Sequence, residues 1–272
     1  MSVSTTPTAL VAIRAAGSKP PVYCVHAQSG HLRLYHNLSR YLDADRPIYG
    51  IRGVLLNDSP TSAYRRFDDM ARRYIQEIRA LHPSGPYLLL GECDGAELAY
   101  EMAQQLRALG HDVSLLALVD SFAPSGPRLR WFATRATYRL ADQLRMVGFH
   151  LSTLRALDRQ SRVEYVKARL VRILDRAALT IPGRRRDTST ELIRRQGFRQ
   201  ALHDYEPAPY DGRVAIVHGS ELPWGVERTA DLGWRGLVGN LEVAELPGYF
   251  GTSLLEPTVR ALADTLGSLL DG

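Results

Sequence analysis

Short continuous runs of hydrophobic residues alternate along the chain with longer stretches in which hydrophobic residues recur every three or four positions. The first pattern is typical of strands buried on both faces of a parallel sheet, and the second of helices that turn one face to a core. The runs that predict strands are residues 21–27, 46–53, 86–95, 113–121, 212–220 and 241–248. The stretches that predict helices are residues 31–43, 64–82, 96–109 and 256–270. This alternation predicts an α/β fold with a mostly parallel sheet flanked by helices.

The alternation stops between residues 122 and 210. This segment holds arginine-rich stretches with helical spacing and a loop-like Ile-Pro-Gly-Arg-Arg-Arg-Asp-Thr, but no convincing strand pattern. It therefore predicts a helical insertion into one α/β domain rather than a second domain with its own core. A chain of 272 residues lies within the roughly 250–300 that a single hydrophobic core can reach.

Residues 1–19 have neither the basic start nor the long apolar stretch of a signal peptide, and they predict a flexible leader before one domain over residues 20–272. No apolar run approaches the roughly 18–20 residues that a membrane span requires. Two cysteines, Cys24 and Cys93, are too few for a disulfide scaffold and suit a reducing compartment. These features predict a cytoplasmic protein with no membrane partner.

Charge is distributed unevenly along the chain. Residues 128–199 contain 18 Arg and Lys against 6 Asp and Glu, whereas the rest of the chain contains 16 against 23. A basic segment on an acidic body suggests a partner or substrate that carries negative charge, although an arginine-rich composition alone also produces such a surface. The sequence has no RNA-binding aromatic motif, zinc-ligand spacing or recognition-helix pattern, so nucleic acid is not a predicted partner.

The segment Gly91-Glu92-Cys93-Asp94-Gly95 lies between a buried strand and an amphipathic helix. Glycines in these positions relieve crowding in a strained turn that projects a nucleophile above the edge of the sheet. The backbone N–H of Asp94 would then lie at a helix N-terminus, where it can donate to a developing oxyanion. Cys93 is thus a candidate nucleophile, and the alternative is a tight turn around a buried, inert cysteine.

Motifs of one known family recur along nearly the whole chain. They are P-V-Y-C-V-H-A-Q-S-G, R-P-I-Y-G-I, G-P-Y-L-L-L-G-E-C-D-G-A, L-L-A-L-V-D-S and E-L-P-G-Y-F-G-T-S-L-L-E-P. In these segments the chain resembles the thioesterase family of nonribosomal peptide and polyketide synthases, which has the α/β-hydrolase fold with a helical lid. The resemblance implies that Cys93 is the nucleophile, that Asp120 is the triad acid and that the N–H of Ala27 is a second oxyanion donor. It also implies that residues 122–210 form the lid.

The same resemblance implies a substrate and a partner. The substrate would be an acyl or peptidyl chain carried on the phosphopantetheine of a carrier protein, with no metal and no other cofactor. On this interpretation the basic insertion attracts the phosphate of phosphopantetheine and an acidic carrier protein.

Two departures from the family pattern bear on the chemistry. Cysteine stands where most members have serine, and Phe250 stands where the catalytic histidine belongs, directly after Tyr249. No histidine follows His218, so the triad lacks its usual proton carrier. His218 ends a predicted strand at the same sheet edge as the elbow, the turn over residues 91–95. His26 ends the first strand beside the oxyanion loop, which is the loop that carries Ala27. Both histidines are therefore candidate bases.

Acidic residues surround the candidate nucleophile. If they face it, Glu92, Asp94 and Glu97 raise the pKa of the Cys93 thiol, because nearby negative charge disfavours the thiolate. Asp94, Glu92 and Tyr249 are therefore further candidates for a base or for lining the site. The simpler interpretation is that Asp94 and Glu97 suit the first turn of a helix through its dipole.

Loss of the histidine should slow hydrolysis far more than acyl loading. A free thiol with a pKa of about 8.5 is partly ionised near neutrality and can attack with little help, whereas water needs a base within hydrogen-bond reach. The sequence thus predicts an enzyme that takes a carrier-bound acyl chain onto Cys93 and releases it by transfer, cyclisation or condensation. Ordinary hydrolytic off-loading with a recruited base, non-covalent acid–base chemistry and a non-catalytic carrier-binding module remain alternatives.

Overall fold

The structure is a computed structural model that describes residues 8–54, 66–124, 185–271 and a series of positions between 144 and 170. In this part of the chain seven strands form one sheet in the order β1-β3-β2-β4-β5-β6-β7, and every neighbouring pair is parallel except β1 with β3. The strands are β1 (Leu10–Arg14), β2 (Val22–Val25), β3 (Ile48–Ile51), β4 (Tyr87–Glu92), β5 (Val113–Val119), β6 (Tyr210–Glu221) and β7 (Val238–Tyr249). The helices are α1 (Tyr35–Leu38), α2 (Phe67–Leu81), α3 (Gly95–Ala108), α6 (Arg185–His203), α7 (Thr258–Asp271) and the 3-10 helix η2 (Trp234–Gly236). The predicted mostly parallel α/β sheet is confirmed.

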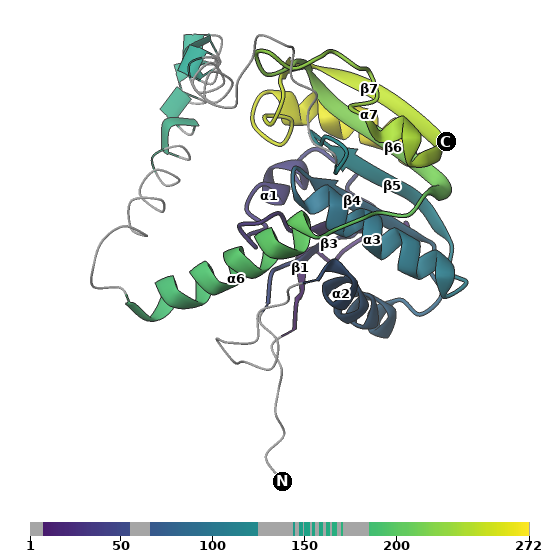
Figure 1. The fold of residues 1–272 in the computed structure, drawn as a ribbon. Helices are drawn as coiled ribbons and strands as arrows, with labels where there is room; N and C mark the ends of the chain where they lie inside the picture. Colours follow the sequence, from purple (N-terminus) through teal and green to yellow (C-terminus); the bar gives the residue numbers. More distant parts are fainter. Residues whose placement is uncertain are drawn as a thin grey trace.

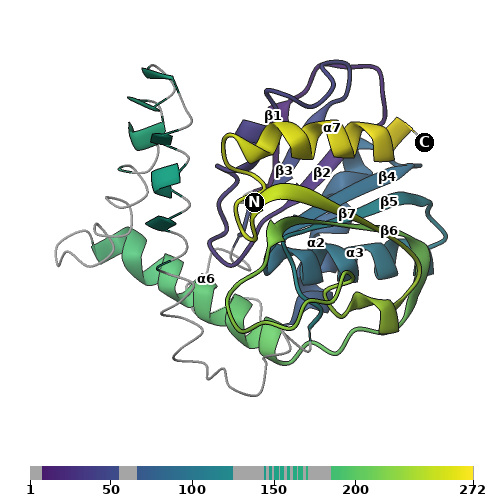
Figure 2. The ribbon, with the colours of Figure 1, turned by 90° about the horizontal axis from the view of Figure 1, so that it is seen from above.

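Helices cover both faces of the sheet, which makes three layers (Figure 1; Figure 2). Side chains of α2 and α3 join one buried cluster and those of α1 and α7 join the other. Along β2, Tyr23 and Val25 belong to the first cluster, whereas Val22 and Cys24 belong to the second. Because side chains alternate between the two faces of a strand, one continuous hydrophobic run supplies both layers.

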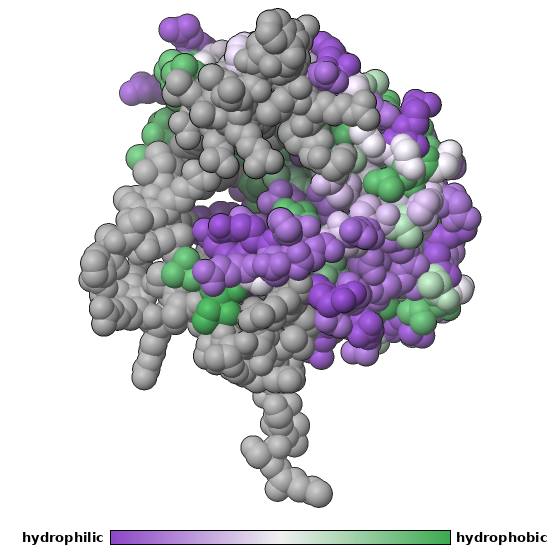
Figure 3. All heavy atoms as spheres, viewed as in Figure 1, coloured by the Kyte–Doolittle hydropathy of each residue, from purple (hydrophilic) through white to green (hydrophobic). Residues whose placement is uncertain are grey.

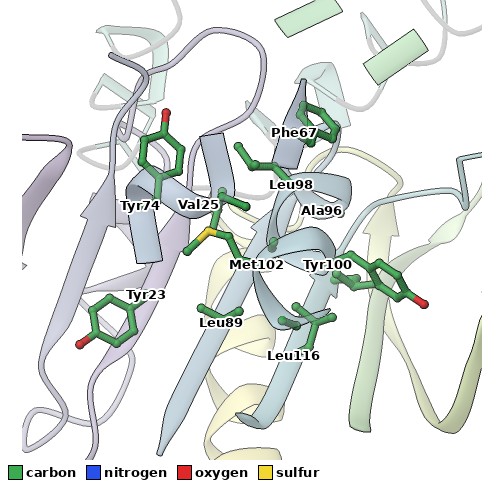
Figure 4. Close-up of a cluster of buried hydrophobic side chains, with 14 of the residues drawn as sticks. Tyr23, Val25, Phe67, Tyr74, Leu89, Ala96, Leu98, Tyr100, Met102 and Leu116 are labelled. Atoms are coloured by element: carbon green, nitrogen blue, oxygen red, sulfur yellow. The ribbon is translucent and has the colours of Figure 1, made fainter. Parts of the chain in front are cut away.

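The buried cluster under α3 anchors the turn that precedes this helix. Leu89 of β4 and Leu116 of β5 lie on the same side of the sheet as Tyr100 and Met102 of α3 (Figure 4). Hydrophobic residues in α3 recur at helical spacing, so that one face of the helix is buried against the sheet. This packing fixes the start of α3 directly above the end of β4.

The helix predicted over residues 31–43 is much shorter in the structure, where α1 spans four residues and is followed by turns. No side chain caps its first turn, and the Ser39 hydroxyl donates to the carbonyl of His36. Local bonds of this kind compete with a helical ladder. Leu38 and Leu42 are buried nonetheless, so the hydrophobic spacing marked burial correctly but not helix length.

The prediction of a flexible leader over residues 1–19 is wrong for the segment that forms β1, which pairs antiparallel with β3. Long-range polar contacts hold this edge strand. The Glu77 carboxylate of α2 accepts from the backbone N–H of Ala9 at 2.7 Å and of Leu10 at 3.0 Å. The Arg14 guanidinium donates to the carbonyls of Ser39, Leu42 and Arg46. Residues 1–7 lie outside the described residues.

The predicted insertion falls between β5 and β6, and most of residues 122–210 lies outside the described residues. Its described C-terminal part contains α6, which confirms a helical pattern there, and the figures show α6 running along one end of the sheet (Figure 1; Figure 2). The described part of α6 forms a hydrophilic band on the face drawn in Figure 3. None of the described helices combines the length and apolar character needed to cross a bilayer.

Candidate active site

Cys93 occupies a sharp turn between β4 and α3. Its φ is 53°, which is in the left-handed region that costs a non-glycine residue of the order of 1 kcal/mol. The backbone N–H of Cys93 donates to the carbonyl of Val119 on β5 at 3.0 Å, which holds the strained residue against the sheet. The side chain is accessible to solvent, although protein atoms also surround the sulfur closely enough to affect its pKa.

Two glycines allow the turn to pack closely. A Cβ on Gly91 would lie 2.6 Å from the Cα of Ala96, and one on Gly95 would lie 2.7 Å from the carbonyl oxygen of His26. Real Cβ atoms do not approach other atoms so closely. The glycines therefore bring the start of α3 against both β4 and the chain that follows β2.

We expect Gly95→Ala to lower the free energy of unfolding by about 1–3 kcal/mol, because the added methyl group must displace backbone atoms. Gly267→Ala in α7 is the matched control. A Cβ there meets nothing within 4 Å, and the helix interior should gain about 0.5–1 kcal/mol from the change. Urea unfolding of the three proteins measures both effects. Equal stability changes in the two variants would contradict the close approach at Gly95.

Burial, and after it the acidic groups nearby, favour the thiol form of Cys93. The protein atoms that displace water from the sulfur raise the pKa of Cys93 well above its ordinary value, and the negative charges of Asp94 and Glu92 raise it further. The backbone N–H of Asp94 acts in the opposite direction. The expectation of a partly ionised, self-sufficient thiol is therefore replaced by a thiol that needs a base. Asp94 is placed for that role, because its Oδ1 lies 3.7 Å from Sγ and burial raises the pKa of its carboxyl.

The candidate oxyanion donor Ala27 lies at the same sheet edge as Cys93. Val25, two residues before Ala27, pairs with Gly91, two residues before Cys93, on adjacent parallel strands. The Ala27 carbonyl accepts from the N–H of Gly30 at 2.8 Å, which closes a turn over residues 27–30. Within the described residues no carbonyl accepts from the N–H of Ala27 or of Asp94. The backbone N–H of Asp94 instead bonds to the Cys93 sulfur.

Asp120 directly follows β5 and contacts both β6 and the loop after β7. It is buried with a φ of 47°. One carboxylate oxygen accepts from the N–H of Gly219 in β6 at 3.0 Å, and the other accepts from the N–H of Ser253 after β7 at 2.9 Å. Burial raises the pKa of Asp120, and these N–H donors lower it. The carboxylate therefore holds the loop that carries Phe250, three residues before Ser253.

His26 is part of the packing between helices. Its Nδ1 donates to the carbonyl of Ala27 at 2.8 Å, and its Nε2 accepts from the Tyr74 hydroxyl at 2.8 Å. The ring also packs on Phe198 of α6, with 5.5 Å between centroids. Burial lowers the pKa of His26 to about 4, so the ring stays neutral and both nitrogens are engaged.

His218 is buried at the C-terminal end of β6, where the sequence placed it. Its two ring nitrogens face the carbonyls of Gly219 at 3.0 Å and of Ala230 at 3.3 Å. Both contacts are with main-chain carbonyls, one within β6 and one in the segment between β6 and η2. The structure therefore does not bring His218 to Cys93 as a proton carrier.

Aromatic side chains gather where the chain leaves β7. Phe250 packs on Phe122, with 4.6 Å between ring centroids, and its N–H donates to the carbonyl of Glu221 at 3.0 Å. Tyr249 is buried at the end of β7, and Glu92 is half-buried at the end of β4. The wall beside Asp120 is thus apolar rather than basic.

Two residues near the site gain roles that local sequence patterns do not signal. Glu97 lies in the first turn of α3, as the sequence suggested, but it is buried, and among the described residues its Oε2 has no hydrogen-bond partner. Burial, with the charge of Asp94 adding to it, raises the pKa of Glu97 to about 8. Arg194 of α6 contacts the oxyanion loop, because its Nη2 donates to the carbonyl of Ser29 at 2.6 Å. Both features depend on packing between distant parts of the chain.

This sheet order, together with the strand–turn–helix elbow and the carboxylate on the next strand, defines the α/β-hydrolase class. The thioesterase domain family matches residues 20–208, and the chain belongs to that family. Malpinin synthetase of Mortierella alpina is 40% identical over 114 residues, which are 41% of this chain and 1% of that protein. The chain thus spans a small part of this curated relative.

Two solved structures extend the comparison to the whole fold. A four-domain nonribosomal peptide synthetase bound to AMP and glycine superposes with a TM-score of 0.69 and 26% identity, over 97% of this chain and 20% of that chain. The NocB thioesterase domain from the nocardicin cluster superposes with a TM-score of 0.65 and 24% identity, over 94% of this chain and 96% of that one. The second likeness supports the fold.

Proposed function

We propose that this thioesterase domain takes an acyl or peptidyl chain from a carrier protein onto Cys93 and passes it to an acceptor other than water. The observation that carries the proposal is a solvent-accessible cysteine at the strand–helix turn of a chain in which no histidine follows His218. The nitrogens of His26 and His218 are engaged by other groups. A site of this kind has a nucleophile, but neither of these two histidines is free to act as the general base for water.

In the loading step Asp94 accepts the proton of the Cys93 thiol as Sγ attacks the carbonyl carbon of the carrier thioester. The N–H groups of Ala27 and Asp94 donate to the oxyanion that forms. The bond to the phosphopantetheine sulfur then breaks, and this sulfur takes the proton from Asp94. One thioester replaces another, so the exchange is close to isoenergetic and requires only a modest base.

In the release step an amine, a hydroxyl or the carbanion of a carbon acid attacks the acyl carbon and the bond to Sγ breaks. The Cys93 sulfur takes up the proton that the amine, the hydroxyl or the carbon acid has given up. Water is a weaker nucleophile than these acceptors and depends on a base within hydrogen-bond reach. The apolar pair of Phe122 and Phe250 disfavours such a water beside Asp120. Transfer, cyclisation and condensation all use this step.

The partner of the proposed reaction is a carrier protein that presents phosphopantetheine. The arginine-rich character of residues 128–199 supports a negatively charged partner, and the exposed face of α6 is hydrophilic (Figure 3). The cytoplasm is the proposed location, on the cysteine content alone.

The proposal is tested by incubating the protein with small acyl thioesters and measuring its intact mass. We expect one long-lived acyl adduct that maps to Cys93 and is lost in Cys93→Ala. Cys24→Ala is the matched control and should load normally, because Cys24 is fully buried. Asp94→Asn should slow loading by about 10²-fold or more, because it removes the base.

Other outcomes of this experiment separate the alternatives. Rapid release of free acid without an adduct would indicate ordinary hydrolysis by a recruited base. Turnover that persists in Cys93→Ala would indicate non-covalent acid–base chemistry. Retained carrier-protein binding with an unreactive Cys93 would indicate a binding module.

A further inference from the structure

Helix α6 contacts the oxyanion loop through the side chain of Arg194. Its Nη2 donates to the carbonyl of Ser29 at 2.6 Å, and its guanidinium lies over two glycines. A Cβ on Gly30 would lie 2.6 Å from Arg194 Cζ, and a Cβ on Gly53 would lie 3.0 Å from Arg194 Cδ. The N–H of Gly53 also donates to the carbonyl of Gly30 at 3.2 Å. The Arg194 side chain therefore occupies space that a side chain at position 30 or 53 would need.

The loop under Arg194 is the one that presents Ala27. The turn over residues 27–30 is closed by the bond from the Gly30 N–H to the Ala27 carbonyl at 2.8 Å. Arg194 bonds to Ser29, inside this turn. A shift of the guanidinium therefore changes the support of the turn and, with it, the direction of the Ala27 N–H.

A second contact from the same face of α6 holds the other side of Ala27. Phe198 lies four residues after Arg194, which places both side chains on one face of the helix. The Phe198 ring is buried, with 5.5 Å between its centroid and that of His26 and 5.0 Å to that of Phe67. His26 directly precedes Ala27, and Ser29 lies two residues after it. Helix α6 therefore contacts the oxyanion loop on both sides of Ala27.

We propose that Arg194 is a positioning residue that aims the Ala27 N–H at the oxyanion formed on Cys93, so that docking of α6 promotes acyl transfer. This inference rests on the proposed function, because it requires an oxyanion. An oxyanion donor acts only in the acyl-transfer transition state and not in the alkylation of a thiol, which forms no tetrahedral oxyanion. Comparing the two reactions at the Cys93 sulfur therefore distinguishes a change in the direction of the Ala27 N–H from a change in the accessibility of the sulfur.

The test compares two second-order rate constants at Cys93, for acylation by a small acyl thioester and for alkylation by iodoacetamide. We expect Arg194→Met to slow acylation by about 10- to 100-fold, part of what the loss of a whole oxyanion donor costs, and to leave alkylation within about twofold. Arg199→Met, an exposed arginine on the same helix, removes the same charge and should change neither rate. Arg194→Lys should restore part of the acylation.

Gly53→Ala provides a second variant in case Arg194→Met fails to fold. It keeps the charge and pushes on the stem of Arg194, so we expect the same selective loss of acylation to a smaller extent. Parallel losses of acylation and alkylation would overturn the inference, as would unchanged acylation in a folded Arg194→Met. Absence of acylation in the unmodified protein, with alkylation intact, would instead refute the proposed function.

Discussion

Replacing Phe250 by histidine should turn a long-lived acyl-enzyme into one that hydrolyses quickly. Phe250 lies in the loop that Asp120 holds through the Ser253 N–H at 2.9 Å. The Asp120 carboxylate accepts from the main-chain N–H groups of Gly219, Ser253 and Gly251, so an imidazole at position 250 would share it with these donors. A positioned general base typically contributes 10²–10⁴-fold, and we expect the half-life of the Cys93 adduct to fall by about that factor.

The measurement is the decay of the adduct mass after removal of excess acyl thioester. Phe250→Leu is the matched control, because it also removes the aromatic ring but adds no base. Combining Phe250→His with Asp120→Asn should abolish most of the gain, since the imidazole then loses its charged partner. Equal decay in Phe250→His and Phe250→Leu would show that this position does not reach the acyl group.

The second large effect concerns stability and comes from Glu97. Burial holds the pKa of this carboxyl at about 8, against an ordinary value of 4.5, so the folded protein favours the neutral form. Above pH 4.5 the unfolded chain releases this proton while the folded protein keeps it. The contribution of Glu97 to stability is therefore fully present below about pH 4.5 and is lost progressively as the pH rises to about 8. At 1.36 kcal/mol per pKa unit the loss amounts to about 5 kcal/mol at most.

Urea unfolding at pH 5 and pH 8 measures this loss. Glu97→Gln does not titrate, so we expect its free energy of unfolding to fall less between the two pH values than that of the unmodified protein. The exposed Glu227→Gln is the matched control and should follow the unmodified protein. Other buried acids, such as Asp94 and Asp120, add to the slope in both proteins and cancel in the comparison. If the free energy of unfolding fell equally between pH 5 and pH 8 in Glu97→Gln and in the unmodified protein, Glu97 would not be protonated in the folded protein.

The elbow could be predicted from the sequence because its determinants are local. A buried strand, flanking glycines and an amphipathic helix within about 20 residues specify the turn at Cys93 almost independently of the rest of the chain. The placement of Ala27 and Asp120 at the same edge also follows from the sequence, since parallel strands end on one side of a sheet. The strand order then makes these strands neighbours of β4.

The proton chemistry of the site could not be predicted in the same way. His26 and His218 are both at the correct edge, but hydrogen bonds to Tyr74, Ala27, Gly219 and Ala230 engage their nitrogens elsewhere. The directions of side chains depend on contacts between distant segments, which no local periodicity encodes.

By itself the sequence determined the mostly parallel sheet, the turn at Cys93 and the absence of any histidine after His218, because each depends on neighbouring residues or on residue identity. Only the tertiary structure decided that residues 10–14 are a strand, that Glu97 is buried and that Arg194 lies on the glycines of the oxyanion loop. These three depend on where chain segments far apart in sequence come into contact. Burial and long-range contacts arise when the layers pack together, and the electrostatics of Cys93 are set at that stage.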